Sequence, residues 1–346
     1  MTTPVPAPQP ELRTLHPAYF AMVMATGIVS IAAQLLGMAP LAQALLVVNV
    51  VCAIALAILT ILRIVWYPAD VVSDLRHHGR AVGFFAMVAA IAVLGSQAVL
   101  VAHAWTAAVL LWFAAIALWV LLTYGIFTIL TVQLDKPTLP EGINGGWLVS
   151  VVAPQSIAVL GAQLAQGFGG SADAVLLFCL AMWLGGGMLY IWIISLIFYR
   201  YTFFTMNPSD LAPPYWINMG AVAISTLAGC LLILASPESR LLTELLPFLK
   251  GFTLLFWATA TWWIPMLLTL GVWRHVYRRF PLRYDPLYWG AVFPLGMYTA
   301  CTWRLAQALD TAWLFAIPRV TFWVALVAWA ATLAGLLRQL ARAMVR

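Results

Sequence analysis

The sequence predicts an all-α integral membrane protein, and three observations support this fold class. Of its 346 residues, 64% are hydrophobic and only 8% are charged, whereas a soluble globular chain carries roughly 25% charged residues. The apolar stretches are continuous, and each is long enough for a bilayer crossing of about 20 residues. Backbone groups in lipid must be satisfied within the segment, and stretches of this length exclude barrel strands, so the spans are expected to be helices.

Ten transmembrane helices are expected from the apolar stretches. In chain order they cover residues 17–37, 41–66, 81–102, 105–132, 147–167, 172–200, 215–236, 243–275, 285–308 and 311–342. The odd-numbered helices are close to the minimum span, whereas the even-numbered ones are longer and should tilt or project. Most links from an odd to an even helix are short, so we expect five helical hairpins in one domain of residues 17–342. The remaining chain forms a short N-terminal tail, 1–16, and a C-terminal end, 343–346.

The basic residues are distributed unevenly between the two sides of the predicted spans. Only Arg240 lies clearly in a loop on the side opposite the termini, whereas most of the others lie in the longer loops or near the termini. The positive-inside rule then predicts that both termini are cytoplasmic, which requires an even number of spans. We expect a multi-pass protein of a bacterial-type inner (plasma) membrane. The net charge of +6 is explained by these loops, so no nucleic-acid partner is expected.

Three basic residues lie inside the predicted spans, namely Lys250, Arg304 and Arg319. Each is in the outer part of its helix, so snorkelling to the headgroups is one explanation. The other is a role in attracting ions, because charges within the membrane are costly and usually mark a pathway or an ion pair. No Asp or Glu lies deep in any predicted span. Basic residues without acidic partners favour an anion over a cation.

The ninth predicted helix contains the most informative pattern. Phe293 and Arg304 are 11 residues apart, so they share a helical face about 16 Å apart along the axis. Gly296 and Ala300 lie between them on that face, where small residues indicate either close helix packing or space beside a pore. Pro294 removes a backbone donor and should kink the helix near Phe293.

Other odd-numbered helices carry polar stripes at helical spacing. These are Thr26 and Ser30 in the first helix, Ser156 with Pro154 in the fifth, and Asn218 and Ser225 in the seventh. The stripes are candidates for a pore lining. Hydrogen bonds between helices are the more frequent explanation for each stripe taken alone.

Two short motifs resemble the tellurite-resistance/C4-dicarboxylate transporter family. They are the segment 16–30, which contains Met24-Ala25-Thr26-Gly27, and the segment Val292-Phe293-Pro294-Leu295-Gly296. That family also contains plant slow-type anion channels, the fungal malate permease and fungal sulfite efflux pumps. The resemblance extends over the whole chain in helix number and rhythm.

The resemblance implies an architecture and a gate. Odd-numbered helices would form an inner ring around a central pore, and even-numbered helices an outer layer. The protein would be a homotrimer with one pore in each subunit. Phe293 would plug the pore, Gly27 would belong to the lining with the candidates above, and Arg304 would face the outer mouth. Lys250 and Arg319, on outer helices, would contact lipid or neighbouring subunits more readily than the ion.

The predicted function is passage of small anions of the chloride, nitrate, sulfite, tellurite or C4-dicarboxylate class, without a cofactor or metal. One alternative is a proton-coupled C4-dicarboxylate carrier of the same fold, although no titratable group is evident along the path. A second is a membrane-embedded enzyme, which would need catalytic groups facing one cavity. Buried carboxylates and an HExxH motif do not occur in the sequence, so an enzyme is not expected.

Overall fold

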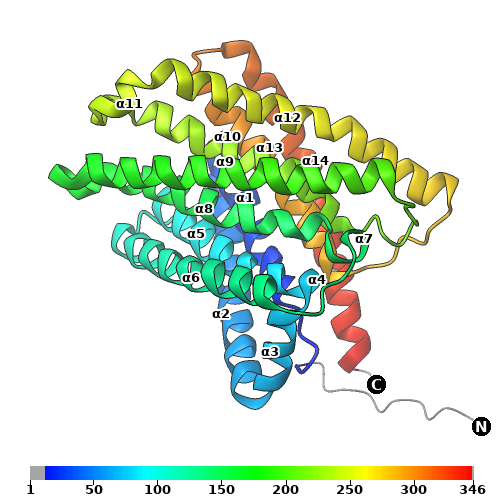
Figure 1. The fold of residues 1–346 in the computed structure, drawn as a ribbon. Coiled ribbons are helices and arrows are strands. Elements are labelled where there is room, and N and C mark those ends of the chain that lie inside the picture. Colours follow the sequence, from blue (N-terminus) through cyan, green and yellow to red (C-terminus); the bar gives the residue numbers. More distant parts are fainter. Residues whose placement is uncertain (1–11, 345–346) are drawn as a thin grey trace, which may run out of the picture.

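The computed structural model describes residues 12–344, and the regular secondary structure within this range is helical (Figure 1). Residues 1–11 of the predicted N-terminal tail and residues 345–346 of the predicted C-terminal end lie outside the described range. The end of α14 and the short helices α3 and α7 lie at one end of the helix bundle, and α11 lies at the other (Figure 1). We call the former the loop face.

Long helices agree closely with the expected apolar stretches. They are α1 (Ala21–Leu35), α2 (Ala39–Trp66), α5 (Phe85–Leu100), α6 (Trp105–Val132), α8 (Val149–Leu164), α9 (Ala172–Phe203), α10 (Ile217–Leu234), α12 (Leu246–Val272), α13 (Trp289–Ala308) and α14 (Ala316–Met344). The connections contain helices that the sequence analysis did not anticipate: α3 (Pro68–Arg76), α4 (His78–Ala81), α7 (Leu139–Gly142) and α11 (Arg240–Glu244). These are short, and most carry charge, so an apolar pattern could not reveal them.

Within the described range, eight helical segments are long and apolar enough to cross a membrane. The difference from the expected ten arises at two places. The segment Gly145–Phe203 counts once although it contains both α8 and α9, which are joined by 3-10 turns with a break at Gly169. Helix α13 is not among the eight, and it contains Arg304 and Gln307 as well as several small and polar residues.

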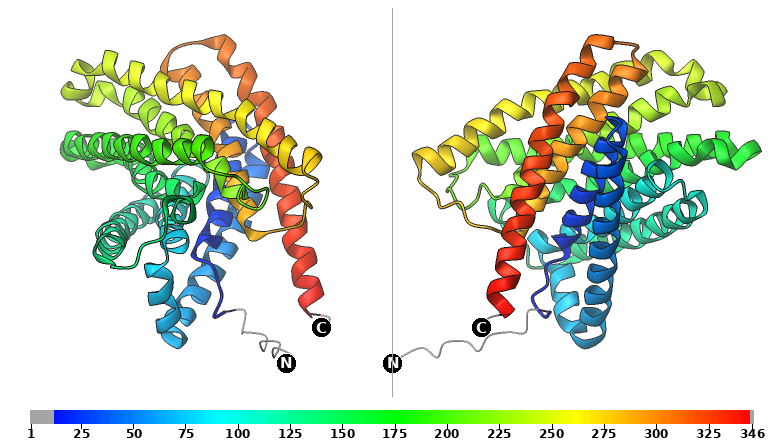
Figure 2. Two further views of the ribbon diagram at one scale, coloured as in Figure 1. Left: turned by 45° about the vertical axis from the view of Figure 1, so that its right-hand side comes forward. Right: turned by 180° about the vertical axis from the view of Figure 1, so that it is seen from behind.

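The long helices fall into two groups by burial. Most residues of α1, α5, α8, α10 and α13 are buried, and we call these five the buried helices. In α2, α6, α9, α12 and α14 large apolar side chains remain exposed, as expected for surfaces that face lipid. The buried helices contact one another in a closed cycle, α1–α5–α8–α10–α13–α1. Each also packs against one long outer helix that follows it in the chain, and the outer helices are visible at the periphery in Figure 2.

Tight reversals join most buried helices to their outer partners. Residues with positive φ occupy these links at Gly37, His103, Gly169 and Asp310. Gly169, at φ 54° and ψ −123°, adopts a conformation that only glycine tolerates without strain. The link between α10 and α12 is longer and contains α11.

Every buried helix begins with a 3-10 turn at the loop face. The turns are η1 (Pro17–Phe20), η2 (Val82–Phe84), η3 (Gly145–Leu148), η5 (Pro213–Trp216) and η8 (Pro286–Tyr288). The side chains of His16, Asn144 and Asp285 accept a hydrogen bond from a backbone N–H in the turn that follows each of them. The turns pack closely, since a Cβ on Gly145 would lie 2.5 Å from the Pro214 carbonyl oxygen. Five similar helix starts are therefore gathered around one site.

A buried ion-pair network fixes α2 to α3 at the loop face. Arg63 and Arg80 both donate to the Asp74 carboxylate, with nitrogen–oxygen distances of 2.7 Å and 2.5 Å. Burial raises the pKa of Asp74, but the hydrogen bonds from Arg80 and Arg63 lower it more, so the net pKa lies below its usual value. Arg63 also donates to the Arg13 carbonyl oxygen, which anchors the segment before the first 3-10 turn.

Asp74→Asn is expected to destabilise the protein by about 3 kcal/mol, because two guanidinium groups lose their shared counter-charge in a mostly buried site. The measurement is thermal unfolding of the purified protein in detergent. Glu244→Gln serves as the control, since the Arg240–Glu244 pair is largely exposed and such pairs contribute little. Equal melting temperatures for Asp74→Asn and the wild type would contradict the prediction.

Candidate functional site

A cavity of about 250 Å³ opens among the five buried helices at the loop face. All five contribute residues from their first turns or from the 3-10 turns before them. These include Ala18 and Ala21 of η1 and α1, Val82 and Ala86 of η2 and α5, Gly146 and Val149 of η3 and α8, Pro214 and Ile217 of η5 and α10, and Leu287 and Gly290 of η8 and α13. We call this the large cavity.

Helix direction gives the large cavity a defined electrostatic character. Because all five buried helices begin at this cavity, their positive dipole ends converge on it. Backbone N–H groups in the first turn of a helix have no intrahelical acceptor, and such ends favour negative charge. At three of the five helix starts a side chain already accepts from one of these N–H groups, so it is the helix dipoles that favour negative charge in the cavity.

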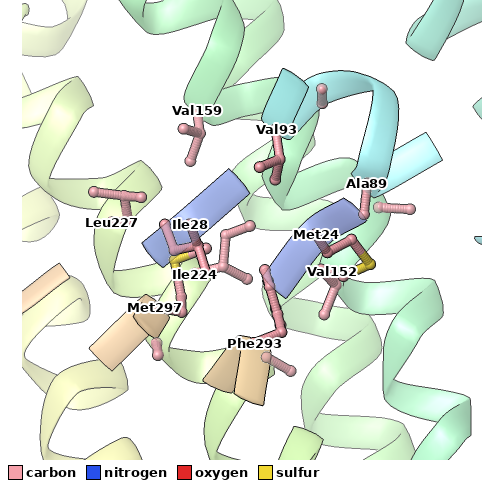
Figure 3. Packing of buried hydrophobic residues seen from close by; sticks show 14 of the residues in the cluster. Met24, Ile28, Ala89, Val93, Val152, Val159, Ile224, Leu227, Phe293 and Met297 are labelled. Carbon is pink, nitrogen blue, oxygen red and sulfur yellow. The ribbon is translucent and has the colours of Figure 1, made fainter. Parts of the chain in front are cut away.

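Apolar side chains fill the space beyond the large cavity. Phe293 of α13 lines the inner end of this cavity with Met24 of α1 and Val152 of α8, and its ring is only 1% exposed. One turn further along α1 and α13, Ile28 and Met297 line a second cavity. Figure 3 shows apolar side chains from all five buried helices packed close together in this region, among them Phe293 and Met297. Four residues correspond to about 6 Å of helix, so a constriction about one turn long separates the cavities.

The second cavity, which we call the small cavity, has a volume of about 20 Å³ and is also lined by all five buried helices. Arg304 is part of its lining, as are the polar side chains of Ser96, Ser156 and Gln163. The Arg304 guanidinium donates to the Gln307 side-chain oxygen at 2.8 Å. Arg304 thus lies beyond the constriction as seen from the large cavity, and Phe293 forms part of the constriction itself.

Most of the hydroxyl-bearing residues predicted for the lining take part in contacts between or within helices. Thr26 accepts a hydrogen bond from Trp329 of α14, and Ser30 donates to the Ala42 carbonyl of α2. Ser225 donates within its own helix to the Ala221 carbonyl. Asn218 donates to the Tyr201 hydroxyl of α9. The bonds of Thr26, Ser30 and Asn218 are the interhelical bonds expected as the alternative, whereas that of Ser225 is intrahelical. Ser156 lines the small cavity and also donates within its own helix to the Val152 carbonyl.

Predicted small residues lie at close helix contacts. A Cβ on Gly27 would lie 2.5 Å from Val93, and one on Gly296 would lie 2.8 Å from Ile28. Pro294, inside α13, packs against Gly220 of α10, where a Cβ would lie 2.6 Å from the proline ring. Pro154, inside α8, and Ala300 are buried. These contacts bring the buried helices together around the constriction.

The remaining predicted basic residues lie away from the two cavities. Lys250 on α12 is half-buried and Arg319 on α14 is exposed, and neither is part of the lining of the large or the small cavity. Both are on outer helices, which fits lipid or subunit contacts.

Sequence reasoning missed several polar residues at the large cavity, namely His16, Asn144, Arg200 and Tyr215. Each lies at the end of a predicted helix. Polar residues are common at such positions, so their presence there does not by itself indicate a function. The available signal was their position: all four lie at the ends of helices that meet at the loop face.

His16 is held neutral by its surroundings. Burial and the nearby Arg80 guanidinium lower its pKa to about 4, while its Nδ1 accepts a hydrogen bond from the Ala18 N–H at 3.0 Å. Asp74 acts in the opposite direction, whereas Arg63 and His77 add to the lowering. The residue lines the large cavity as an uncharged acceptor at neutral pH.

Stability is expected to fall as the pH decreases from about 6.5 to about 4. In this window the unfolded chain binds a proton at His16 and the folded chain does not, so protonation favours unfolding. His16→Asn keeps an acceptor for the Ala18 N–H without a titratable ring. Thermal unfolding at pH 7 and pH 4.5 should therefore show a drop a few degrees larger for the wild type than for the variant. The same drop in both proteins would rule out this role of His16.

Comparison with known proteins places these features in a family. A family model described as voltage-dependent anion channel matches residues 14–337. Uncharacterized membrane proteins from two strains of Mycobacterium tuberculosis are each 39% identical over 154 residues, covering 44% of this chain and 77% of the relative. An uncharacterized transporter of Methanocaldococcus jannaschii is 24% identical over 335 residues, covering 94% of both chains. A second uncharacterized transporter of that organism is 24% identical over 332 residues.

Proposed function

The chain belongs to the voltage-dependent anion channel family, a family of multi-pass membrane proteins, and on this premise we propose that it passes small anions through a pore within each subunit. The observation that carries the proposal is the alignment of the large cavity, Phe293, the small cavity and Arg304 among five helices that all begin at the loop face. Chloride, nitrate, sulfite, tellurite and C4-dicarboxylates are the candidate substrates.

The proposed architecture has ten crossings in five hairpins, with the buried helices as the inner ring and the remaining long helices as the outer layer. The closed cycle of helix contacts supports the ring, and exposed apolar side chains on the outer helices support the lipid-facing layer. We propose that the loop face is cytoplasmic, in a bacterial-type inner (plasma) membrane, and that the subunits assemble as a homotrimer.

In the proposed mechanism an anion enters the large cavity, attracted by the five helix N-termini. The constriction around Phe293 blocks the path because apolar side chains cannot replace the hydration shell of the ion. Rotation of the Phe293 ring opens the path to the small cavity. Arg304 then offers a positive charge at the far side, which lowers the cost of a partly dehydrated anion.

The test is anion flux into liposomes that contain the purified protein, with chloride, nitrate, sulfite and malate offered separately. Flux above that of protein-free liposomes is expected for at least one of these anions. Its absence for all four would overturn the proposal.

A proton-coupled carrier remains the second candidate, because His16 is titratable and lines the large cavity, as do the carboxyl groups of Glu141 and Asp210. The His16 pKa of about 4 keeps this side chain neutral near pH 7, which favours passive flux. Malate accumulation driven by a pH gradient alone would favour the carrier, whereas flux that follows only the anion gradient and membrane potential favours the channel.

A further inference from the structure

Arg200, at the end of α9, carries a buried positive charge beside the large cavity. Its side chain is 8% exposed and forms part of the cavity lining. None of the ion pairs among the described residues involves Arg200. A buried charge without an ion-pair partner is costly, so its presence at the edge of a cavity requires an explanation.

Part of the guanidinium group has a structural role. Nη1 donates to the Ile143 carbonyl at 2.7 Å and also to the Tyr215 hydroxyl. These bonds fix the loop before η3 and the turn η5 to the end of α9. The guanidinium also lies over the Tyr215 ring, with Cζ 6.0 Å from the ring centroid, which is a cation–π contact. None of these contacts supplies a carboxylate partner for the positive charge.

The remaining donors on Arg200 are unused. Nε has no hydrogen-bond partner but is also almost inaccessible, and the hydrogen bonds of Arg200 within the described residues all come from Nη1. Nη2 is therefore the guanidinium nitrogen left for an anion. The Tyr215 hydroxyl accepts from Arg200, and this leaves its own proton free to donate. Asn144, which also lines the cavity, uses its side-chain oxygen for the Gly146 N–H. Its amide nitrogen therefore remains a third donor.

Acidic residues near the cavity do not neutralise Arg200. Glu141 and Asp210 contribute to the lining, but each is engaged in its own loop. The Glu141 carboxylate accepts from the Thr138 N–H and hydroxyl. Asp210 accepts from the Asn207 N–H and from the Asn207 and Ser209 side chains. The lining therefore carries two carboxylates and one guanidinium, but the carboxylates are held in their own loops, so an incoming anion can pair with Arg200 without displacing an ion pair.

We propose that Arg200, Tyr215 and Asn144 form an anion-recognition site in the large cavity that prefers planar oxyanions, such as carboxylates and nitrate, to halides. Nη2 of Arg200 and the neighbouring Tyr215 hydroxyl can donate to two oxygens of one planar anion, as paired donors do at carboxylate sites, whereas a spherical halide offers no second oxygen. The inference rests on the proposed function, since it names the group that selects among anions before they reach Phe293. Helix N-termini attract all anions, whereas Arg200 discriminates by shape.

Arg200→Lys is the decisive variant, because it keeps the charge and removes the planar fork. Malate and nitrate are added as competitors of chloride efflux from liposomes containing the full chain. Chloride efflux is expressed relative to each protein's own rate without competitor. The concentration of malate needed for half-inhibition is then expected to rise about tenfold, as for the loss of one charge-assisted hydrogen bond. Tyr215→Phe should shift inhibition in the same direction without altering the ring packing. Arg240→Lys, at the exposed opposite end, is the matched control.

Calorimetric titration of malate into the detergent-solubilised protein separates this inference from the proposed function. Binding that weakens in Arg200→Lys and Tyr215→Phe supports the site even if no flux is found. If the wild type carries chloride but malate and nitrate act equally on wild type and both variants, the recognition site is wrong and the channel proposal stands. If Arg200→Lys does not fold, Tyr215→Phe decides alone.

Discussion

Phe293→Ala is expected to raise anion flux about tenfold or more, which corresponds to about 1.4 kcal/mol or more removed from the barrier. The ring is almost fully buried in the constriction, and the gap between the two cavities is only about one helical turn. Removing the ring leaves a space that joins the large cavity to the small one. The measurement is chloride and nitrate flux in liposomes at matched protein density.

The control for this variant must distinguish an increase in flux caused by opening of the path from an increase caused by destabilisation of the fold. Alanine at a buried phenylalanine costs about 3–5 kcal/mol through the lost contacts and the cavity left behind. Phe85 on α5 is equally buried, packs against Phe127 of α6, and lies outside the linings of both cavities. Phe85→Ala should therefore destabilise the protein without raising flux. If Phe293→Ala folds and conducts at the wild-type rate, the gate is refuted.

Arg304→Glu is expected to lower anion flux about tenfold, because it replaces an attractive charge by a repulsive one beside a narrow cavity of low dielectric. Arg304→Gln should give an intermediate loss. Higher ionic strength should weaken the effect only partly, since the side chain is not fully exposed. The assay is the same liposome flux, measured at low and high salt.

Arg319→Glu and Lys250→Glu provide the comparison for this second variant. Both residues are on outer helices and outside the linings of the two cavities. Their substitution should change flux by much less than the Arg304 substitution. Equal losses for all three would mean that only the general surface charge matters, and Arg304 would then have no specific place on the path.

The assignment as a membrane protein and the positions of the long helices could be predicted from the sequence. Each segment in lipid must satisfy its own backbone hydrogen bonds, so the requirement can be assessed one segment at a time. Pro154 and Pro294 lie inside helices as expected. The short helix α3 could not be predicted in this way, because it lies outside the spans and depends on contacts such as Arg63–Asp74.

The candidate site was predictable only in part. The shared helical face of Phe293 and Arg304 could be predicted from their spacing in the sequence, and both residues line cavities in the structure. Thr26 and Ser30 were predicted as pore-lining residues from the same kind of spacing, yet their side chains contact outer helices. Helical periodicity tells which residues share a face but does not tell which neighbour that face meets.

The sequence by itself determined a helical membrane protein with most of its basic residues on one side, because burial in lipid and the charge bias of loops act on each segment separately. Only the tertiary structure decided that five helix N-termini meet at one cavity, and that Arg200 joins them from the end of an outer helix. The physical reason is that a cavity is made by several segments at once. Its electrostatics depend on which helix ends are brought together, and that information is absent from any single stretch of chain.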